Sequence, residues 1–271
     1  GRLFKARDLV AQSFTEEEAN VMYAMSREVE FIHGFISHCW GSSRMAKVLS
    51  LLFHLNLLAA TIVSAIMALL TGIMQMQGWL PLYACNSTNC RNGMAFAPWC
   101  WSVGSFSFFL TFFYWHVVAD YIGIGKGYFF DKLCVHQYNK ERQMAGILSF
   151  AAFVSNTKEF IMLWDNLYFT RLWCTLEVAS LVKAHGDSRI PLTFLPVELG
   201  RLAFIGIVLF NCMQGLYLIN LLLDDIIPAD ILISLVGFVA IYRVVHASRK
   251  YMVQRKALSA QLETFKVAEA N

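Results

Sequence analysis

Three stretches of this chain contain no Asp, Glu, Lys or Arg: residues 48–90, 92–119 and 202–223. An α-helix needs about 20 consecutive apolar residues to cross a hydrocarbon core about 30 Å thick, and each stretch is long enough. Only 15% of the 271 residues are charged, whereas soluble domains carry about 25%. The chain is therefore predicted to be a polytopic membrane protein.

We expect about four transmembrane helices. Three follow directly from the charge-free stretches, over 54–78, 97–118 and 202–223. The fourth, 226–247, is apolar only between Asp230 and Arg243. Long side chains near helix ends can extend to the interface, so this segment can also span; the alternative is a re-entrant or interfacial helix.

Lysine and arginine residues predict the orientation, because they are enriched on the cytoplasmic side of membrane proteins. One side of the bilayer would receive most of the basic residues: Arg44, Lys47, Lys126, Lys132, Arg201, Arg243, Arg249, Lys250, Arg255 and Lys256. The other side would receive Arg91 and an acidic turn with Asp224, Asp225 and Asp230. Both termini and segment 121–200 are therefore expected in the cytoplasm, and the 79–96 loop in the lumen or outside the cell.

The 79–96 loop contains "YACNSTNCRNG". Cys85 and Cys90 are close enough for a small-loop disulfide in an oxidising compartment, and Asn86 begins a glycosylation acceptor pattern. The alternative is a polar turn with free thiols.

The two ends of the chain are expected to be amphipathic helices. Residues 1–32 contain a helical pattern over 14–31, which Thr15 can cap and whose first turn is acidic. Residues 248–271 form a basic helix, which could lie on an anionic membrane face, pack on the cytoplasmic domain or be solvated.

Residues 121–200 differ in kind from the membrane segments. Short apolar runs at 127–130, 158–165 and 189–196 alternate with helical patterns over 142–154 and 167–186. Such alternation is typical of a parallel α/β sheet, which needs at least one further strand. Residues 33–41 are the obvious source. The chain would thus start an α/β domain at 33–47, leave it for a transmembrane hairpin over 48–120, and complete it at 121–200 before a second hairpin over 201–247.

Three motifs occur in order in this divided domain: "FISHCWG" (35–41), "FFDKLCVHQYNKE" (129–141) and "YFTRLWCTLEVA" (168–179). Together they resemble the TIR (Toll/interleukin-1 receptor) superfamily and, most closely, the related heterokaryon-incompatibility (HET) domain. The resemblance covers about 31–41 and 121–197. It departs from the family where some eighty residues, with two membrane segments, separate the first helix from the second strand.

The resemblance implies a flavodoxin-like parallel sheet and a candidate activity. Many TIR domains cleave NAD at the nicotinamide–ribose bond with a glutamate that matches Glu177, and other TIR domains are interaction modules. NAD is therefore a possible substrate, and no firmly bound cofactor is implied. The residues carried over as ligand-binding are Ser37, His38, Trp40, Gly41, Asp131, Gln137 and Trp173.

The chemistry of these residues agrees with that expectation. Ligands of open parallel sheets sit beyond the carboxyl ends of the strands, where the first two motifs fall. A carboxylate such as Glu177 could stabilise positive charge on a ribose, and Trp40 or Trp173 could stack on a base. The alternatives are a solvated charge for Glu177, a core position for Trp173 and a capping role for Asp131.

Two other kinds of site are not expected. His38, Cys39, Cys134 and His136 have no zinc-like spacing, so no metal site is predicted. A net charge of +3, with no basic run interleaved with aromatic residues, does not indicate nucleic-acid binding.

Two functions remain open. The first is a membrane-anchored TIR/HET-like signalling protein that cleaves NAD(P) or senses a nucleotide, with the lipid bilayer, protein partners or its own copies as partners. The second is a non-enzymatic accessory subunit of a larger membrane complex. Transport is disfavoured, because the segments lack a central charge.

Overall fold

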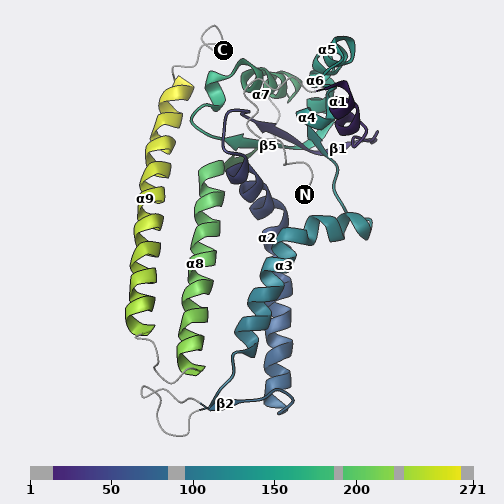
Figure 1. The fold of residues 1–271 in the computed structure, drawn as a ribbon. Coiled ribbons are helices and arrows are strands. Elements are labelled where there is room, and N and C mark those ends of the chain that lie inside the picture. The colour runs from purple at the N-terminus through teal and green to yellow at the C-terminus, as the bar shows by residue number, and fades with distance from the viewer. Residues whose placement is uncertain (1–14, 85–94, 186–191, 223–228, 264–271) are drawn as a thin grey trace. The chain divides into compact units, whose positions relative to one another are not determined.

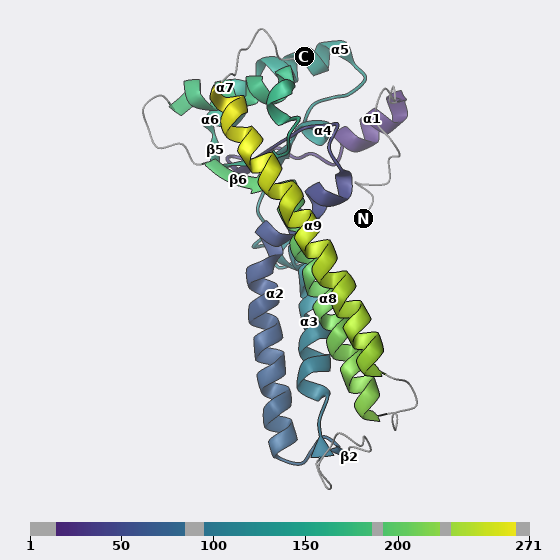
Figure 2. The ribbon, with the colours of Figure 1, turned by 90° about the vertical axis from the view of Figure 1, so that its left-hand side faces the viewer.

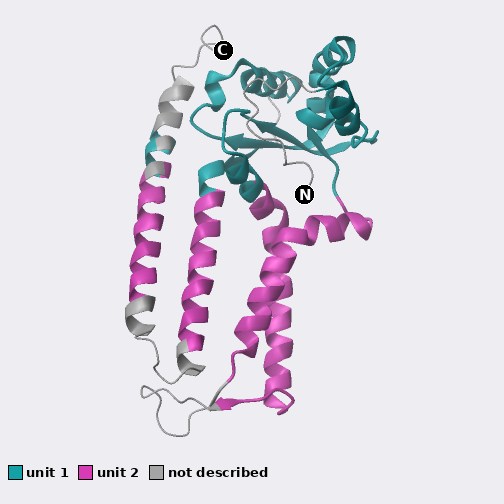
Figure 3. Ribbon diagram, in the orientation of Figure 1, with its two compact units in different colours: residues 1–50, 126–199, 252–271 teal, residues 51–125, 200–251 magenta. Residues whose placement is uncertain are grey.

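The computed structural model of the protein describes residues 15–84, 95–185, 192–222 and 229–263. The chain divides into two compact units (Figure 3). Unit 1 contains residues 1–50, 126–199 and 252–271, and unit 2 contains residues 51–125 and 200–251. Unit 1 is thus assembled from parts of the chain that the first membrane hairpin separates.

Unit 1 contains a parallel sheet of four strands, so the predicted α/β class is confirmed (Figure 1). The strands are β1 (Ile32–His38), β4 (Tyr128–Phe130), β5 (Thr157–Trp164) and β6 (Leu192–Pro196), in the order β4-β1-β5-β6. The central strands are buried along most of their length, since helices cover parallel sheets on both faces. This is why their sequences are continuous apolar runs.

Gly34 allows β1 and β4 to pair closely. A Cβ atom at this position would lie 2.7 Å from two atoms of the Tyr128 ring. Gly34 is paired with Tyr128 in the parallel register. A side chain here would therefore displace the tyrosine that starts β4.

Short helices surround the sheet: α1 (Glu16–Tyr23), α4 (Asp131–Cys134), α5 (Lys140–Leu148), α6 (Phe150–Ser155), the 3₁₀ turn η1 (Tyr168–Thr170) and α7 (Leu172–His185). Thr15 caps α1 as predicted, through a reciprocal capping box with Glu18, but the helix ends well before residue 31. Two other predictions were wrong in detail. The helix expected over 142–154 is broken at Ser149, and the one expected from 167 begins at Leu172.

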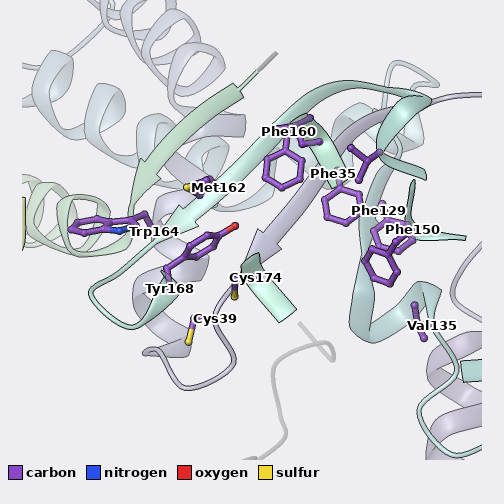
Figure 4. Packing of buried hydrophobic residues seen from close by; sticks show 12 residues of the cluster. Phe35, Cys39, Phe129, Val135, Phe150, Phe160, Met162, Trp164, Tyr168 and Cys174 are labelled. Carbon is purple, nitrogen blue, oxygen red and sulfur yellow. The ribbon is translucent and has the colours of Figure 1, made fainter. Parts of the chain in front are cut away.

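The core of unit 1 lies between the sheet, α6 and α7. Phe35 of β1 stacks on Phe129 of β4 and on Phe160 of β5, with ring centroids 4.7 and 5.2 Å apart. Phe150 of α6 packs edge-on against the rings of Phe35 and Phe129. Figure 4 shows this aromatic row, with Cys39, Cys174 and Tyr168 at the other end of the same buried cluster.

Unit 2 is a bundle of long helices. Within the described residues, three helices are long and apolar enough to cross a membrane: Arg44–Met76 (α2), Trp99–Tyr121 (α3) and Val197–Ile219 of α8 (Val197–Leu222). Between α2 and α3, β2 (Tyr83–Ala84) pairs with β3 (Ala95–Phe96). Figures 1 and 2 show α9 (Ala229–Glu263) beside α8, where Met213 lies 3.3 Å from the Cβ position of Gly237. The segments expected separately at 226–247 and 248–271 therefore share one continuous helix over the described residues 229–263.

Small and polar residues join α2 to α3. Every fourth residue of α2 is small or forms a contact with α3: Asn56, Ala60, Ser64, Ala68 and Gly72. The Asn56 amide donates to the carbonyl of Phe112 at 2.8 Å and contacts His116 Nδ1 at 3.1 Å. Small residues let membrane helices approach closely, and buried polar groups join them. This stripe therefore lies at the α2–α3 interface.

Gly104 of α3 packs closely against α2. The Cβ position at Gly104 lies 3.3 Å from the Cβ of Ala68, whereas at Gly206 of α8 no atom lies within 4 Å. We expect Gly104→Val to destabilise the hairpin by about 1–3 kcal/mol through overpacking. Thermal unfolding of the full chain in detergent measures this, with Gly206→Val as the matched control. Equal stability of the two variants would contradict the close packing described here.

Candidate functional site

A pocket of about 410 Å³ opens at the carboxyl edge of the sheet. Its wall comes from the residues after β1, from the segment that follows β4, and from α5 and the start of α7. The lining residues are His38, Trp40, Gly41, Asp131, Val135, Gln137, Gln143, Ile147, Arg171, Trp173 and Cys174. Its size is that of small-molecule sites, and its position is where open parallel sheets bind ligands.

The structure brings most of the predicted ligand-binding residues together at this pocket. His38, Trp40, Gly41, Asp131, Gln137 and Trp173 all line it. Ser37 and Glu177 do not; both are buried behind the wall. The three sequence motifs thus contribute to one site, although they come from distant parts of the chain.

Asp131 is the carboxylate of the pocket. Its Oδ2 accepts a hydrogen bond from Trp40 Nε1 at 2.9 Å, and its Oδ1 accepts one from the backbone N–H of Lys132 at 2.6 Å. Its Oδ1 also lies 3.8 Å from His38 Nδ1. Asp131 is the first residue of α4, but it is not the cap: the N-cap is Phe130, without a side-chain cap bond. The Asp131 carboxylate instead holds the Trp40 ring at the rim.

His38 is a neutral wall residue at physiological pH. Burial lowers its pKa to about 4; Lys47 and Lys132 also lower it, and Asp131 opposes the shift. The imidazole stacks on Phe130, with ring centroids 4.9 Å apart. A neutral imidazole offers the pocket a flat, weakly polar surface rather than a charge.

The segment after α4 is held by its own side chains. The Gln137 amide donates to the carbonyls of Val135 at 2.8 Å and Asp131 at 3.3 Å. The Nδ1 atom of His136 accepts from the backbone N–H groups of Tyr138 and Asn139, so its Nε2–H is the donor to Asn20 Oδ1 of α1. These bonds give this side of the pocket a defined shape.

Arg171 brings positive charge to the pocket. It is exposed, and its guanidinium lies beside Gly41, 3.7 Å from the Cβ position of that glycine. Arg171 directly precedes α7, whose first turn supplies Trp173 and Cys174 to the wall. The start of a helix carries partial positive charge, so an arginine beside it favours an anion.

Trp173 belongs both to the core and to the pocket. Its ring packs edge-on against Phe150, with centroids 4.9 Å apart, and it also lines the pocket. It also lies near enough to Glu177 to lower the pKa of that carboxyl, against the larger effect of burial. The roles of core residue and stacking partner are therefore compatible at this position.

Glu177 lies inside unit 1, with 2% of its surface exposed. Ser37 Oγ donates to Glu177 Oε2 at 2.5 Å and also bonds the Tyr168 hydroxyl. Serine has one hydroxyl proton, so the chain of donors runs from Tyr168 through Ser37 to Glu177. Burial raises the pKa of the Glu177 carboxyl well above its usual range, and the nearby Asp131 raises it further. Burial thus favours the protonated form of this carboxyl, which links α7 to β1 through Ser37.

This raised pKa predicts how stability depends on pH. The folded protein keeps a proton on Glu177 that the unfolded chain releases above its ordinary pKa of 4.5, so stability falls as pH rises from there towards the folded pKa. The expected slope is about 1.4 kcal/mol per pH unit. Melting temperatures of the full chain at about pH 5–8 measure it, because this window lies above the unfolded pKa. The neutral isostere Glu177→Gln should flatten the profile, and parallel profiles for both proteins would contradict a protonated carboxyl.

The sequence motifs missed part of the site. Gln143 and Ile147 lie one helical turn apart on α5 and line the pocket, a spacing that would have placed them on one face. Arg171 belongs to the third motif, but it was not among the residues expected to bind a ligand. The hydrogen bond between Tyr168 and Ser37 could not be predicted from the sequence, because the two residues are 131 positions apart.

The predictions for the membrane loop concern other residues. Cys85, Cys90 and Asn86 lie outside the described residues.

Within the described part of the chain, no cluster of three or more His, Cys, Asp or Glu side chains could hold a metal ion.

Comparisons of the chain with family models, with curated proteins and with solved structures find no match.

Proposed function

We propose that the protein is a membrane-anchored TIR/HET-like signalling protein that senses a nucleotide in this pocket. The observation that carries the proposal is the convergence of all three motifs on one open cavity of about 410 Å³. If the domain had lost its ligand, we would expect large side chains to fill the crevice. Here the crevice is open and has polar and aromatic walls.

The wall offers complementary groups for each part of a nucleotide. Arg171 and the start of α7 suit a phosphate. Trp40, with 45% of its surface exposed, and Trp173 can stack on a base. Asp131 is the acceptor placed for a ribose hydroxyl or an amide donor, since it is the carboxylate that lines the pocket. Each of these groups would be of little use to a purely apolar ligand.

The position of Glu177 favours binding over cleavage. The Glu177 carboxyl is buried behind the wall, and burial favours its neutral form, which is unsuited to stabilise positive charge on a ribose in the pocket. Trp173 nevertheless contacts both the pocket and Glu177, so NAD cleavage with Glu177 as the catalytic residue is kept as the second candidate. It would require α7 to shift on ligand binding.

The proposal includes the finer fold and the membrane arrangement. The strand order β4-β1-β5-β6 is second-first-third-fourth along the chain, which agrees with the first four strands of a flavodoxin-like sheet. The apolar part of α9 would be the fourth span. Excess Lys and Arg would keep unit 1 in the cytoplasm. Self-association or protein partners in the bilayer would transmit the signal.

One experiment separates these functions. The full chain in lipid nanodiscs is titrated with NAD, and free nicotinamide is measured in the same samples. Saturable binding without nicotinamide release is the expected result. Release that is lost in Glu177→Gln would support the cleaving enzyme instead. Absence of binding by NAD, ATP and their mononucleotides would favour the accessory subunit.

A further inference from the structure

Two thiols meet in the wall of the pocket. Cys39 follows β1 and Cys174 lies in the first turn of α7, and both are free and almost fully buried. The Cys174 thiol donates to the carbonyl oxygen of His38, the residue before Cys39, with 3.5 Å between sulfur and oxygen. Both cysteines belong to the same buried cluster, and Figure 4 shows their side chains near each other.

The surroundings distinguish the two sulfurs. The Cys174 thiol lowers the pKa of the Cys39 thiol through hydrogen bonding, and a backbone bond from Gly41 and the charge of Arg171 lower it too. Burial and the charge of Asp165 raise the pKa and oppose this shift. The pKa of Cys174 is raised, first by the same hydrogen bond and then by burial. Of the two thiols, Cys39 is therefore the one that more readily loses its proton.

The pocket gives small molecules a route to the pair. Cys174 lines it, and Cys39 belongs to the same buried cluster without lining the pocket itself. Cys134, which is also in unit 1, makes a useful contrast. It is a free thiol, and burial raises its pKa. The groups that act on this pKa are the Phe130 backbone and Asp131, not a second cysteine.

We propose that Cys39 and Cys174 form a redox-reactive dithiol that a peroxide converts to a disulfide in the pocket wall. The Cys39 thiolate attacks one peroxide oxygen, the O–O bond breaks, and the leaving oxygen departs as water or an alcohol after taking a proton. The resulting sulfenic acid is attacked by the Cys174 sulfur, an S–S bond forms, and water leaves. Two thiols lose two electrons in total, and the peroxide is reduced by two.

The disulfide would regulate the site. It would tie the end of β1 to the first turn of α7, between Arg171 and Trp173 on one side and Trp40 on the other. Sulfurs bonded at about 2 Å lie closer together than two free thiols, so the wall would shift. We expect nucleotide affinity to change by about tenfold, the effect of losing one well-placed contact. This consequence rests on the proposed function, whereas formation of the disulfide does not.

The test uses the full chain in nanodiscs, reduced and then treated with hydrogen peroxide. Remaining thiols are alkylated, and peptides are mapped by mass spectrometry without reduction. A peptide pair linked through Cys39 and Cys174, reversed by dithiothreitol, is the expected result. Cys134→Ser should leave it unchanged, while Cys39→Ser and Cys174→Ser should abolish it. The wild-type map decides the matter even if a serine variant fails to fold.

Two outcomes overturn the proposal: no Cys39–Cys174 link, or a link that joins either residue to Cys134 instead. Nucleotide binding by the untreated protein is measured in parallel. A link without binding would overturn only the nucleotide-sensing function. Binding without a link would overturn only the dithiol.

Discussion

Replacing Arg171 with glutamine is expected to weaken nucleotide binding by about 10- to 100-fold, because a charge-assisted hydrogen bond to phosphate contributes about 1.5–3 kcal/mol. The side chain is exposed beside Gly41, so the variant should fold normally. Titration of the full chain in nanodiscs with NAD and ATP measures the loss. The effect should shrink for nucleosides, which have no phosphate.

The control for this variant is Arg142→Gln. Arg142 is an exposed arginine of α5 that does not line the pocket, although its neighbour Gln143 does. The Arg142→Gln substitution removes the same charge from the same unit without changing a residue of the pocket. If both variants bind nucleotide as the wild type does, Arg171 has no role in ligand recognition.

Replacing Glu177 with alanine is expected to reduce the free energy of unfolding by about 2–5 kcal/mol, since the truncation leaves a cavity and removes the acceptor of a buried donor. That donor is Ser37 Oγ. Glu177→Gln keeps the volume and an acceptor oxygen, and should lose much less. Thermal unfolding of the full chain in detergent measures both.

Glu141→Ala provides the matched control for that experiment. Glu141 is exposed in the first turn of α5, so its removal should change stability by about 0.5 kcal/mol or less. A Glu177→Ala protein as stable as the Glu141→Ala protein would show that the buried carboxyl does not hold α7 against the sheet.

The sheet could be predicted from the sequence because parallel strands buried on both faces are continuous apolar runs. The runs at 33–41 and 158–165 form β1 and β5 for that reason. The ligand-binding edge followed from the rule that such sheets bind ligands at the carboxyl ends of their strands. That rule, applied to the strand ends, is enough to place Trp40 and Asp131 at the pocket.

The depth of Glu177 could not be predicted in the same way. The inward face of α7 consists of Cys174, Thr175, Glu177 and Leu181, whereas Leu172 and Leu176 are exposed. Hydrophobic periodicity would therefore have placed the wrong face inward. Burial of the carboxyl depends on Ser37 and Trp173, and the contact with Ser37 crosses 140 residues of sequence. Such contacts leave no local pattern.

The central claim is that a nucleotide occupies the pocket formed by the three motifs, and photo-crosslinking tests it most directly. The full chain in nanodiscs is irradiated with an azido-adenine nucleotide, and labelled peptides are identified by mass spectrometry. The pocket described here predicts adducts on the peptides that contain Trp40 and Trp173, and their loss when unlabelled nucleotide is in excess. Labelling elsewhere, or labelling at these peptides that unlabelled nucleotide does not reduce, would contradict it.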